Sequence, residues 1–369
     1  MRALELEQRW PAPRAPRPIV LIGAGGIAND AHLPAYRALG LEVRGCYDVD
    51  AARARATARR FEIARTYPDL AAACAEPGAV FDLALPPAAV AGVLAVLPRG
   101  AGVLIQKPFG MDLGAAGRLR ELCRERALVA AVNFQLRYAP NMLALRALVE
   151  RGDLGRIVEA DVRVNCKMPW ELWPFLRGLP RMELVLHSIH YLDLLRALLG
   201  AQHGEPRAVW ARTVRHPDAP QLASSRSSAI LDFGDDVRCC LSIHHHHAHG
   251  PAHEASELRI EGTRGAAIAR MGVNLDYPRG RPDALEVALD GQGWREVPLA
   301  GSWFPDAFRG PMSNLQRFLA GDDAQLWTAV DDAWRTMALV EACYASDASG
   351  GTPLPADAAQ PSDARGGRA

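Results

Sequence analysis

The sequence has no excess of charge of either sign and no long apolar run. Its 42 basic and 42 acidic residues give a formal net charge of zero at pH 7, whereas a nucleic-acid-binding surface would show as a basic excess. No stretch approaches the roughly 18 uninterrupted apolar residues of a membrane span, and residues 1–16 lack the apolar run of a secretory signal. We therefore expect neither nucleic acid nor a membrane as a partner.

The cysteines show no Cys-x-x-Cys spacing. Seven of them, an odd number, are scattered along the chain, which is typical of reduced thiols rather than of a disulfide framework. Reduced thiols predict a cytoplasmic protein. They stand at positions 46, 74, 123, 166, 239, 240 and 343.

The length of 369 residues, with 49% hydrophobic and 23% charged residues, predicts a globular protein of two domains. Internal repeats are absent from the sequence. We expect a flexible extension at residues 1–16, a first domain at 17–138, a second at 139–355 and a disordered tail at 356–369.

The first domain alternates apolar strands with segments of helical spacing, such as 51–60 and 113–127. This alternation predicts an α/β domain with a doubly wound parallel sheet, in which ligands bind at the carboxyl ends of the strands. The expected strands are 19–23, 42–47, 80–85, 102–105 and 128–134.

The second domain has strands in succession without helices between them, which predicts an α+β domain with a largely antiparallel or mixed, open-faced sheet. Helices are expected at 141–151, 182–199, 311–319 and 326–346. The expected strands are 157–166, 207–215, 226–233, 236–245, 256–260, 266–270 and 284–288.

A Gly-x-Gly-x-x-Ala turn follows the first apolar strand and opens a helix. Gly23 allows the tight turn, and Gly25 lets the backbone approach a pyrophosphate. Ala28 permits close packing of the helix, whose N-terminal N–H groups face the phosphates. Asp48 ends the second strand twenty residues later, where a carboxylate accepts hydrogen bonds from the adenosine ribose. The pattern predicts a dinucleotide site; a purely structural glycine turn is the alternative.

Asp48 also bears on the choice of cofactor. Its charge would repel a 2′-phosphate, and Val49 and Asp50 follow it instead of a Ser-Arg pair. The sequence therefore favours NAD over NADP.

Lys107 stands in Gln106-Lys107-Pro108, directly after an apolar strand. Proline after it restricts Lys107 to an extended backbone, which aims the side chain at the crevice. A protonated lysine there could hydrogen-bond a substrate oxygen as charge develops. The alternative is a surface lysine at the end of a strand.

His187, His190 and Asp193 are three residues apart, so they lie along one face of the predicted helix. A histidine is a natural proton acceptor for alcohol oxidation near neutral pH. Two alternatives are a pair of buried structural histidines and a metal pair, although the sequence shows no further spaced ligand.

Taken together, these motifs resemble the glucose–fructose oxidoreductase / inositol dehydrogenase (Gfo/Idh/MocA) family of NAD(P)-dependent dehydrogenases, over residues 17–355. Leu85-Pro86-Pro87, Asn133-Phe134 and Ile260-Glu261-Gly262-Thr263 add to the resemblance. It implies catalytic roles for Lys107, His190 and Asp193, and a homo-oligomer formed through the sheet of the second domain. The residues expected to bind the cofactor are Gly23, Gly25, Gly26, Ile27, Ala28, Asp48, Leu85, Pro86, Gln106, Lys107 and Asn133.

Two positions depart from the family pattern. The family has Glu-Lys-Pro where this chain has Gln106, and it has aspartate where this chain has Leu186, four residues before His190. The usual lysine–aspartate–histidine trio is therefore incomplete, and His187 is expected to take over part of the polar role.

An aromatic loop leads into the predicted catalytic helix. Trp170 and Trp173 offer faces on which the C–H surface of a sugar stacks, and Arg181 could fix hydroxyls or a carboxylate. With His187 and His190 they are the expected substrate-binding residues; a packed loop or a dimer contact is the alternative.

Residues 244–249 read His-His-His-His-Ala-His. On a strand, alternation places His245 and His247 on one face and His244 and His246 on the other. Because no carboxylate or cysteine pattern accompanies the run, the sequence predicts no dedicated metal site.

We expect an NAD-dependent dehydrogenase that oxidises a secondary alcohol of a sugar, a polyol or cyclitol, or a sugar-acid-like compound, in carbohydrate metabolism. Three alternatives stay open at this point. They are a redox-neutral NAD-using enzyme of elimination or glycoside cleavage, a catalytically silent NAD-binding regulator, and a structural partner in a hetero-oligomer.

Overall fold

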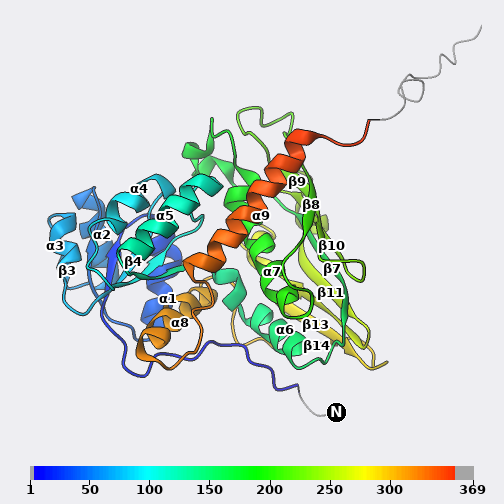
Figure 1. Ribbon diagram of the computed structural model, residues 1–369, viewed down its shortest axis with the longest axis horizontal. Coiled ribbons are helices and arrows are strands. Elements are labelled where there is room, and N and C mark those ends of the chain that lie inside the picture. The colour runs from blue at the N-terminus through cyan, green and yellow to red at the C-terminus, as the bar shows by residue number, and fades with distance from the viewer. Residues whose placement is uncertain (1–3, 354–369) are drawn as a thin grey trace, which may run out of the picture.

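The computed structural model describes residues 4–353 and contains two sheets with helices packed against them (Figure 1). The first sheet is parallel and the second is mixed, so the predicted fold class is confirmed. The tail predicted at 356–369 lies outside the described residues.

The first sheet has six parallel strands in the order β3-β2-β1-β4-β5-β6. Strands β1, β4 and β5 are buried at every position, because helices cover both faces of a doubly wound sheet. The order reverses between β1 and β4, and ligands bind at such a switch point. The strands are β1 (Ile19–Ile22), β2 (Val43–Tyr47), β3 (Arg65–Thr66), β4 (Val80–Leu83), β5 (Gly102–Ile105) and β6 (Val129–Val132). The helices are a π-helical turn (Ala28–His32), α1 (Leu33–Ala38), α2 (Ala51–Phe61), α3 (Leu70–Cys74), α4 (Pro87–Leu94) and α5 (Leu113–Glu125).

The second sheet has eight strands in the order β14-β13-β12-β11-β7-β10-β9-β8. Only β7 and β10 pair in parallel; one face carries α6, α7 and α9, and the other is open (Figure 1). The strands are β7 (Ile157–Asn165), β8 (Ala208–Val214), β9 (Arg226–Asp232), β10 (Arg238–His244), β11 (Ala255–Gly262), β12 (Gly265–Arg270), β13 (Ala284–Leu289) and β14 (Arg295–Glu296). The longer helices are α6 (Pro140–Glu150), α7 (Ile189–His203), α8 (Arg309–Ala320) and α9 (Val330–Ser349). Short 3₁₀ turns cover Gln135–Tyr138, Trp170–Leu172, Pro174–Leu176, Pro251–His253, Gly272–Asn274 and Asp306–Phe308.

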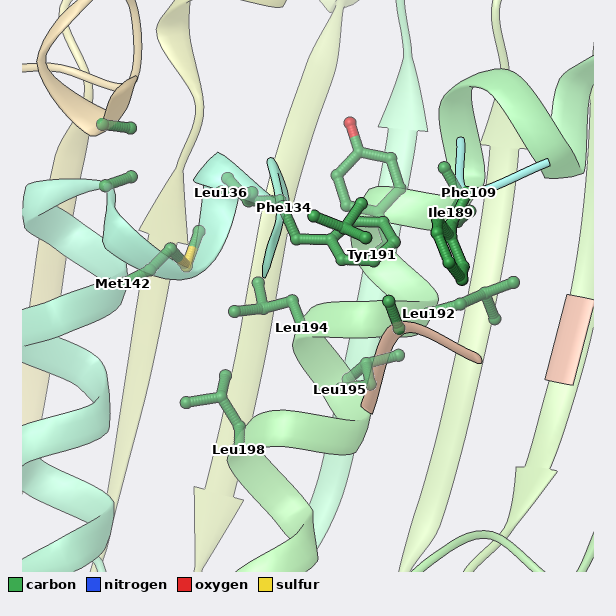
Figure 2. Close-up of a cluster of buried hydrophobic side chains, with 14 of the residues drawn as sticks. Phe109, Phe134, Leu136, Met142, Ile189, Tyr191, Leu192, Leu194, Leu195 and Leu198 are labelled. Atoms are coloured by element: carbon green, nitrogen blue, oxygen red, sulfur yellow. The ribbon is translucent and has the colours of Figure 1, made fainter. Parts of the chain in front are cut away.

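Helix α7 lies in the core where the two domains meet. It follows a π-helical turn at Leu184–Ser188, and its leucines pack near Phe109 and Phe134 of the first domain (Figure 2). The segment Leu184–His203 is long and apolar enough to cross a membrane by length and composition, but 72% of its most apolar stretch is buried inside the protein. Its apolar surface is thus used by the core.

Helix α8 returns to the first domain. Met312 and Leu315 share a buried cluster with Ile19 and Leu21 of β1. Leu319 lies over Gly102, where an added Cβ would stand 2.4 Å from its Cδ1. The first domain is therefore completed by α8, although the segment falls within the second domain expected from the sequence, 139–355.

Residues 4–16, which we call the N-terminal strap, run along the lower edge of both domains (Figure 1). The ring of Trp10 stacks on Trp327 at 5.4 Å between centroids, and its Nε1 donates to Asp323 at 2.9 Å. Gln8 Nε2 donates to the carbonyl of Pro298. The sequence predicted a flexible segment over 1–16, but these contacts hold residues 4–16, because Trp10 finds aromatic partners that lie more than 100 residues away.

Candidate active site

The glycine turn lies at the carboxyl end of β1. Gly23 has a φ of +97°, and an added Cβ would stand 2.5 Å from the carbonyl oxygen of Ala84, so the position requires glycine. An added Cβ on Gly25 would meet nothing within 4 Å. This space beside the backbone is what the approach of a pyrophosphate needs.

The helix after the turn begins at Gly26 and continues through Ile27. Ala28 is fully buried, in keeping with its predicted role in the close approach of helix and sheet. The N–H groups of this first turn are available to phosphate oxygens.

Asp48 joins the end of β2 to the glycine turn. Its carboxylate accepts hydrogen bonds from the N–H groups of Ala24 and Asp50, both at 2.8 Å, and Arg53 Nη1 lies 3.5 Å away. The side chain is 6% exposed. Because each carboxylate oxygen has two lone pairs, these bonds hold the group in place and leave it able to accept from a ribose.

Two buried amide oxygens lie further along the same edge of the sheet. Gln106 Oε1 follows β5 and Asn133 Oδ1 follows β6, and neither has a hydrogen-bond partner within residues 4–353. Leu85 and Pro86 follow β4 at this edge. Buried acceptors usually have partners, so the unpaired oxygens fit a polar ligand, and the residues of this edge together fit a dinucleotide.

Lys107 reaches from the first domain to the second. Its Nζ donates to the carbonyl oxygen of Leu186 at 2.6 Å, and burial lowers the pKa of the ammonium to about 8. The backbone carbonyl of Leu186 thus offers the lysine an acceptor at the position where the resemblance expects an aspartate.

His190 is 7% exposed, and its Nδ1 has no hydrogen-bond partner within residues 4–353. Its ring lies edge to face with Trp303, 5.9 Å between centroids. Burial first, and then the charge of Lys107, lower its pKa well below the usual value. The imidazole is therefore neutral near pH 7, which is the form that accepts a proton.

His187 lies among aromatic rings. Its ring centroid is 5.2 Å from Trp170 and 6.2 Å from Trp173. Burial, followed by the charges of His245, Lys107 and His190, lowers its pKa well below the usual value. The structure therefore brings four of the five predicted substrate-binding residues into one region.

Two predicted residues have other partners. Asp193 is bound by Arg137, with N–O distances of 2.6 and 2.5 Å, and by the hydroxyl of Thr336 at 2.8 Å. Its carboxylate is thus held by these groups and not by the imidazole of His190. Arg181 forms a bidentate ion pair with Glu341, with N–O distances of 2.7 and 2.9 Å.

A buried acid lies behind the histidines and was not predicted from the sequence. Glu183 is fully buried; the hydroxyl of Ser188 donates to it, and His245 Nδ1 lies 3.5 Å from its Oε1. Burial raises the pKa of Glu183 to about 7 and lowers that of His245 to about 3, so near pH 6 both are mostly neutral. The signal was a lone glutamate in the apolar run before His187.

A second missed network supports Asn133. His32 Nδ1 lies 2.8 Å from Asp82 Oδ2, and His32 Nε2 lies 3.1 Å from Asn133 Nδ2. Tyr36 donates its hydroxyl to Asp82 at 2.8 Å. An aspartate within the buried strand β4 was the available signal, because a buried charge needs partners.

Comparisons with known proteins agree with this geometry. Residues 17–134 match the family described as "Oxidoreductase family, NAD-binding Rossmann fold", and residues 142–268 match the "GFO/IDH/MocA C-terminal domain". The D-apiose dehydrogenase of Paraburkholderia graminis is 26% identical over 90% of this chain and 88% of its own. The inositol 2-dehydrogenase of Acidothermus cellulolyticus is 32% identical over 53% of this chain and 57% of its own length.

Solved structures show the same fold. An oxidoreductase from Agrobacterium radiobacter, crystallised with NAD⁺, L-tartaric acid and magnesium, matches with a TM-score of 0.75 at 23% identity. The match covers 91% of this chain and 98% of that one.

Proposed function

The chain belongs to the Gfo/Idh/MocA family of NAD-binding oxidoreductases, which includes sugar and polyol dehydrogenases, and from this premise we propose that it oxidises a secondary alcohol of a sugar, a polyol or cyclitol, or a sugar-acid-like compound. The observation that carries the proposal is the proximity of a neutral His190 on α7 to Lys107, whose charge acts on the imidazole and which follows β5 at the edge of the sheet that holds the dinucleotide turn.

Bound NAD supplies the acceptor for a hydride from the alcohol carbon. His190 accepts the hydroxyl proton, because burial keeps its imidazole unprotonated, and so free to take up a proton, near pH 7. Lys107 donates a hydrogen bond to the same oxygen and stabilises the charge that develops there. The contact between Lys107 and Leu186 supports this role, since it holds the ammonium against the turn that leads to His190.

Gln106 changes the charge around Lys107. The family's glutamate would keep the neighbouring lysine protonated. The neutral amide of Gln106 does not offset the effect of burial, which lowers the pKa of Lys107 to about 8. Lys107 is therefore still mostly charged at pH 7 but titrates close to the physiological range.

Trp170, Trp173 and His187 are proposed to contact the substrate. Indole faces stack on the C–H surface of sugars, and His187 lies beside both rings with its Nδ1 unpaired within residues 4–353. Arg181 and Asp193 are proposed as positioning residues, because Arg181 forms an ion pair with Glu341 and Asp193 forms one with Arg137.

We further propose a cytoplasmic homo-oligomer that associates through the open face of the second sheet. All seven cysteines are free, as expected in a reducing compartment. Trp210 and Ile230 lie opposite each other on β8 and β9 and are 59% and 48% exposed. An apolar pair of this kind on an open sheet supports a contact with a second copy.

The proposal is tested by following NADH formation with aldoses, cyclitols and sugar acids, with NAD and NADP compared in parallel. We expect turnover that prefers NAD, and a smaller preference in Asp48→Ala because the carboxylate no longer repels a 2′-phosphate. Product formed without net NADH would favour a redox-neutral enzyme. Tight NAD binding without any turnover would favour a silent regulator.

Lys107 should set the alkaline limit of activity. Since its pKa is about 8, the ammonium is lost as the pH rises through 8, and kcat should fall there. In Lys107→Arg the guanidinium stays charged, so the fall should disappear although kcat is lower throughout. Lys107→Ala should lower kcat by about 10²–10³-fold, measured by steady-state kinetics from pH 6 to 10.

The matched control is Lys167→Arg, since Lys107 and Lys167 are the only lysines of the sequence and Lys167 is exposed. This variant should keep both kcat and the alkaline fall. An unchanged pH profile in Lys107→Arg would contradict the assignment.

A further inference from the structure

A group of imidazoles gathers at the end of β10 and beyond the end of β8. The ring of His216 stacks on His246 at 4.1 Å and on His244 at 5.9 Å between centroids. His245, between them in sequence, points inward to Glu183, so the predicted alternation of side chains holds from His244 to His246. The group therefore lies on the side of β10 that faces away from Glu183.

The register of the sheet explains why these residues meet. Strand β9 lies between β8 and β10, and its Arg226 is opposite both Val214 and His244. Residues that continue beyond Val214 and beyond His244 therefore leave the sheet at the same edge. This places His216 and Asp218 beside His246.

The three side chains offer a set of metal ligands. One ligand atom each from His216, Asp218 and His246 lies within 4.8 Å of the other two. Ligands at 2.0–2.2 Å from a tetrahedral Zn²⁺ stand about 3.4 Å apart. Side-chain rotations that move the ligand atoms by about 1 Å would therefore bring them to the spacing that Zn²⁺ requires. His246 Nδ1 is buried and has no hydrogen-bond partner within residues 4–353.

The charges around the cluster suit a cation of borderline softness. Imidazole nitrogens, such as those of His216 and His246, are ligands of borderline softness. Asp218 adds a carboxylate. Arg226 opposes a cation, since its charge acts on His244 and His246, but it also donates to the carbonyl of Arg215.

We propose that His216, Asp218 and His246 bind one divalent transition-metal ion, with Zn²⁺ as the probe and one coordination position left open. Two imidazoles and a carboxylate suit Zn²⁺, Ni²⁺ or Cu²⁺ better than Mg²⁺. The sequence predicted no metal because only the His run was visible, whereas two of the three ligands come from a different loop.

The site is joined to the aromatic loop. Lys167 pairs with His246 in an isolated antiparallel bridge, and the carbonyl of His245 accepts from Met168 N at 3.3 Å and Trp170 Nε1 at 3.1 Å. His246 and Trp170 also line a common cavity of about 270 Å³. An ion held by His246 should therefore restrain the segment that carries Trp170.

The test is titration of the metal-free full chain with ZnSO₄ by isothermal calorimetry, without NAD or substrate. We expect one ion per chain with micromolar affinity. His216→Ala and Asp218→Asn should each weaken binding by at least about tenfold, because even changes outside the ligand shell cost 10–100-fold. MgCl₂ should give no binding.

Two variants separate a folded site from capture by the linear His run. His247→Ala and His249→Ala lie in the run but outside the site, and they should bind Zn²⁺ like the unmodified protein. Circular dichroism checks that every variant is folded. Hydrogen exchange should slow at 215–218 and 244–246 when Zn²⁺ is added. Binding that is indifferent to His216, or no binding at all, would overturn the proposal.

Discussion

Replacement of His190 by asparagine is expected to lower kcat for alcohol oxidation by about 10²–10⁴-fold, the range that a positioned general base contributes. The loss should fall on kcat and leave NAD affinity unchanged, because the dinucleotide turn lies in the other domain. Steady-state kinetics on the best substrate of the panel, together with fluorescence titration of NAD, would measure both quantities.

Two further variants sharpen this result. His187→Asn should mainly raise KM, since His187 lies beside both Trp170 and Trp173 in the proposed substrate region. His203→Asn, at the far end of the same helix, should behave like the unmodified enzyme. If His190→Asn stayed within threefold of normal turnover while His187→Asn lost activity, the base would be His187.

Replacement of Asp193 by alanine should destabilise the protein by about 3–5 kcal/mol, the usual cost of removing one partner of a buried ion pair. Arg137 and Asp193 are only 2% and 1% exposed, so the guanidinium would lose both bonds to Asp193 away from water and keep Asp332, 2.5 Å from its Nη2, as a charged partner. Urea unfolding would show a lower midpoint with little change in slope.

The same variant separates a positioning role from a catalytic one. At a temperature where Asp193→Ala is still folded, kcat should stay within a few-fold of normal. The double variant Arg137→Met/Asp193→Leu should recover part of the stability, because no unpaired charge is left. A variant of full stability with a large loss of kcat would instead assign Asp193 to the orientation of the imidazole.

Local pattern was enough to predict most of the fold. The strands of the first sheet are short apolar runs bounded by turns. The glycine turn is recognised by the spacing of its small residues and by the distance to Asp48. In the second domain the alternation of buried and exposed residues placed each long strand within two residues of its bounds. These features depend on neighbours in sequence.

Features that depend on distant contacts were not visible. Nothing near Asp193 in the sequence points to Arg137, which lies 56 residues earlier. Glu183 reads as one polar residue before an apolar run until the fold brings His245 beside it. The N-terminal strap reads as loop because its anchor, Trp327, lies at the other end of the chain.

The parallel pairing of β7 with β10 has a consequence for how the protein folds. Asn165 pairs with His244, so this contact closes a loop that contains the aromatic segment, α7 and two strands. Closure of a long loop loses chain entropy before any contact offsets it, and non-local pairings of this kind slow folding. The glycine turn, by contrast, needs only nearby residues. Since the proposed base His190 lies inside this loop, the protein should become competent for catalysis only after the loop has closed.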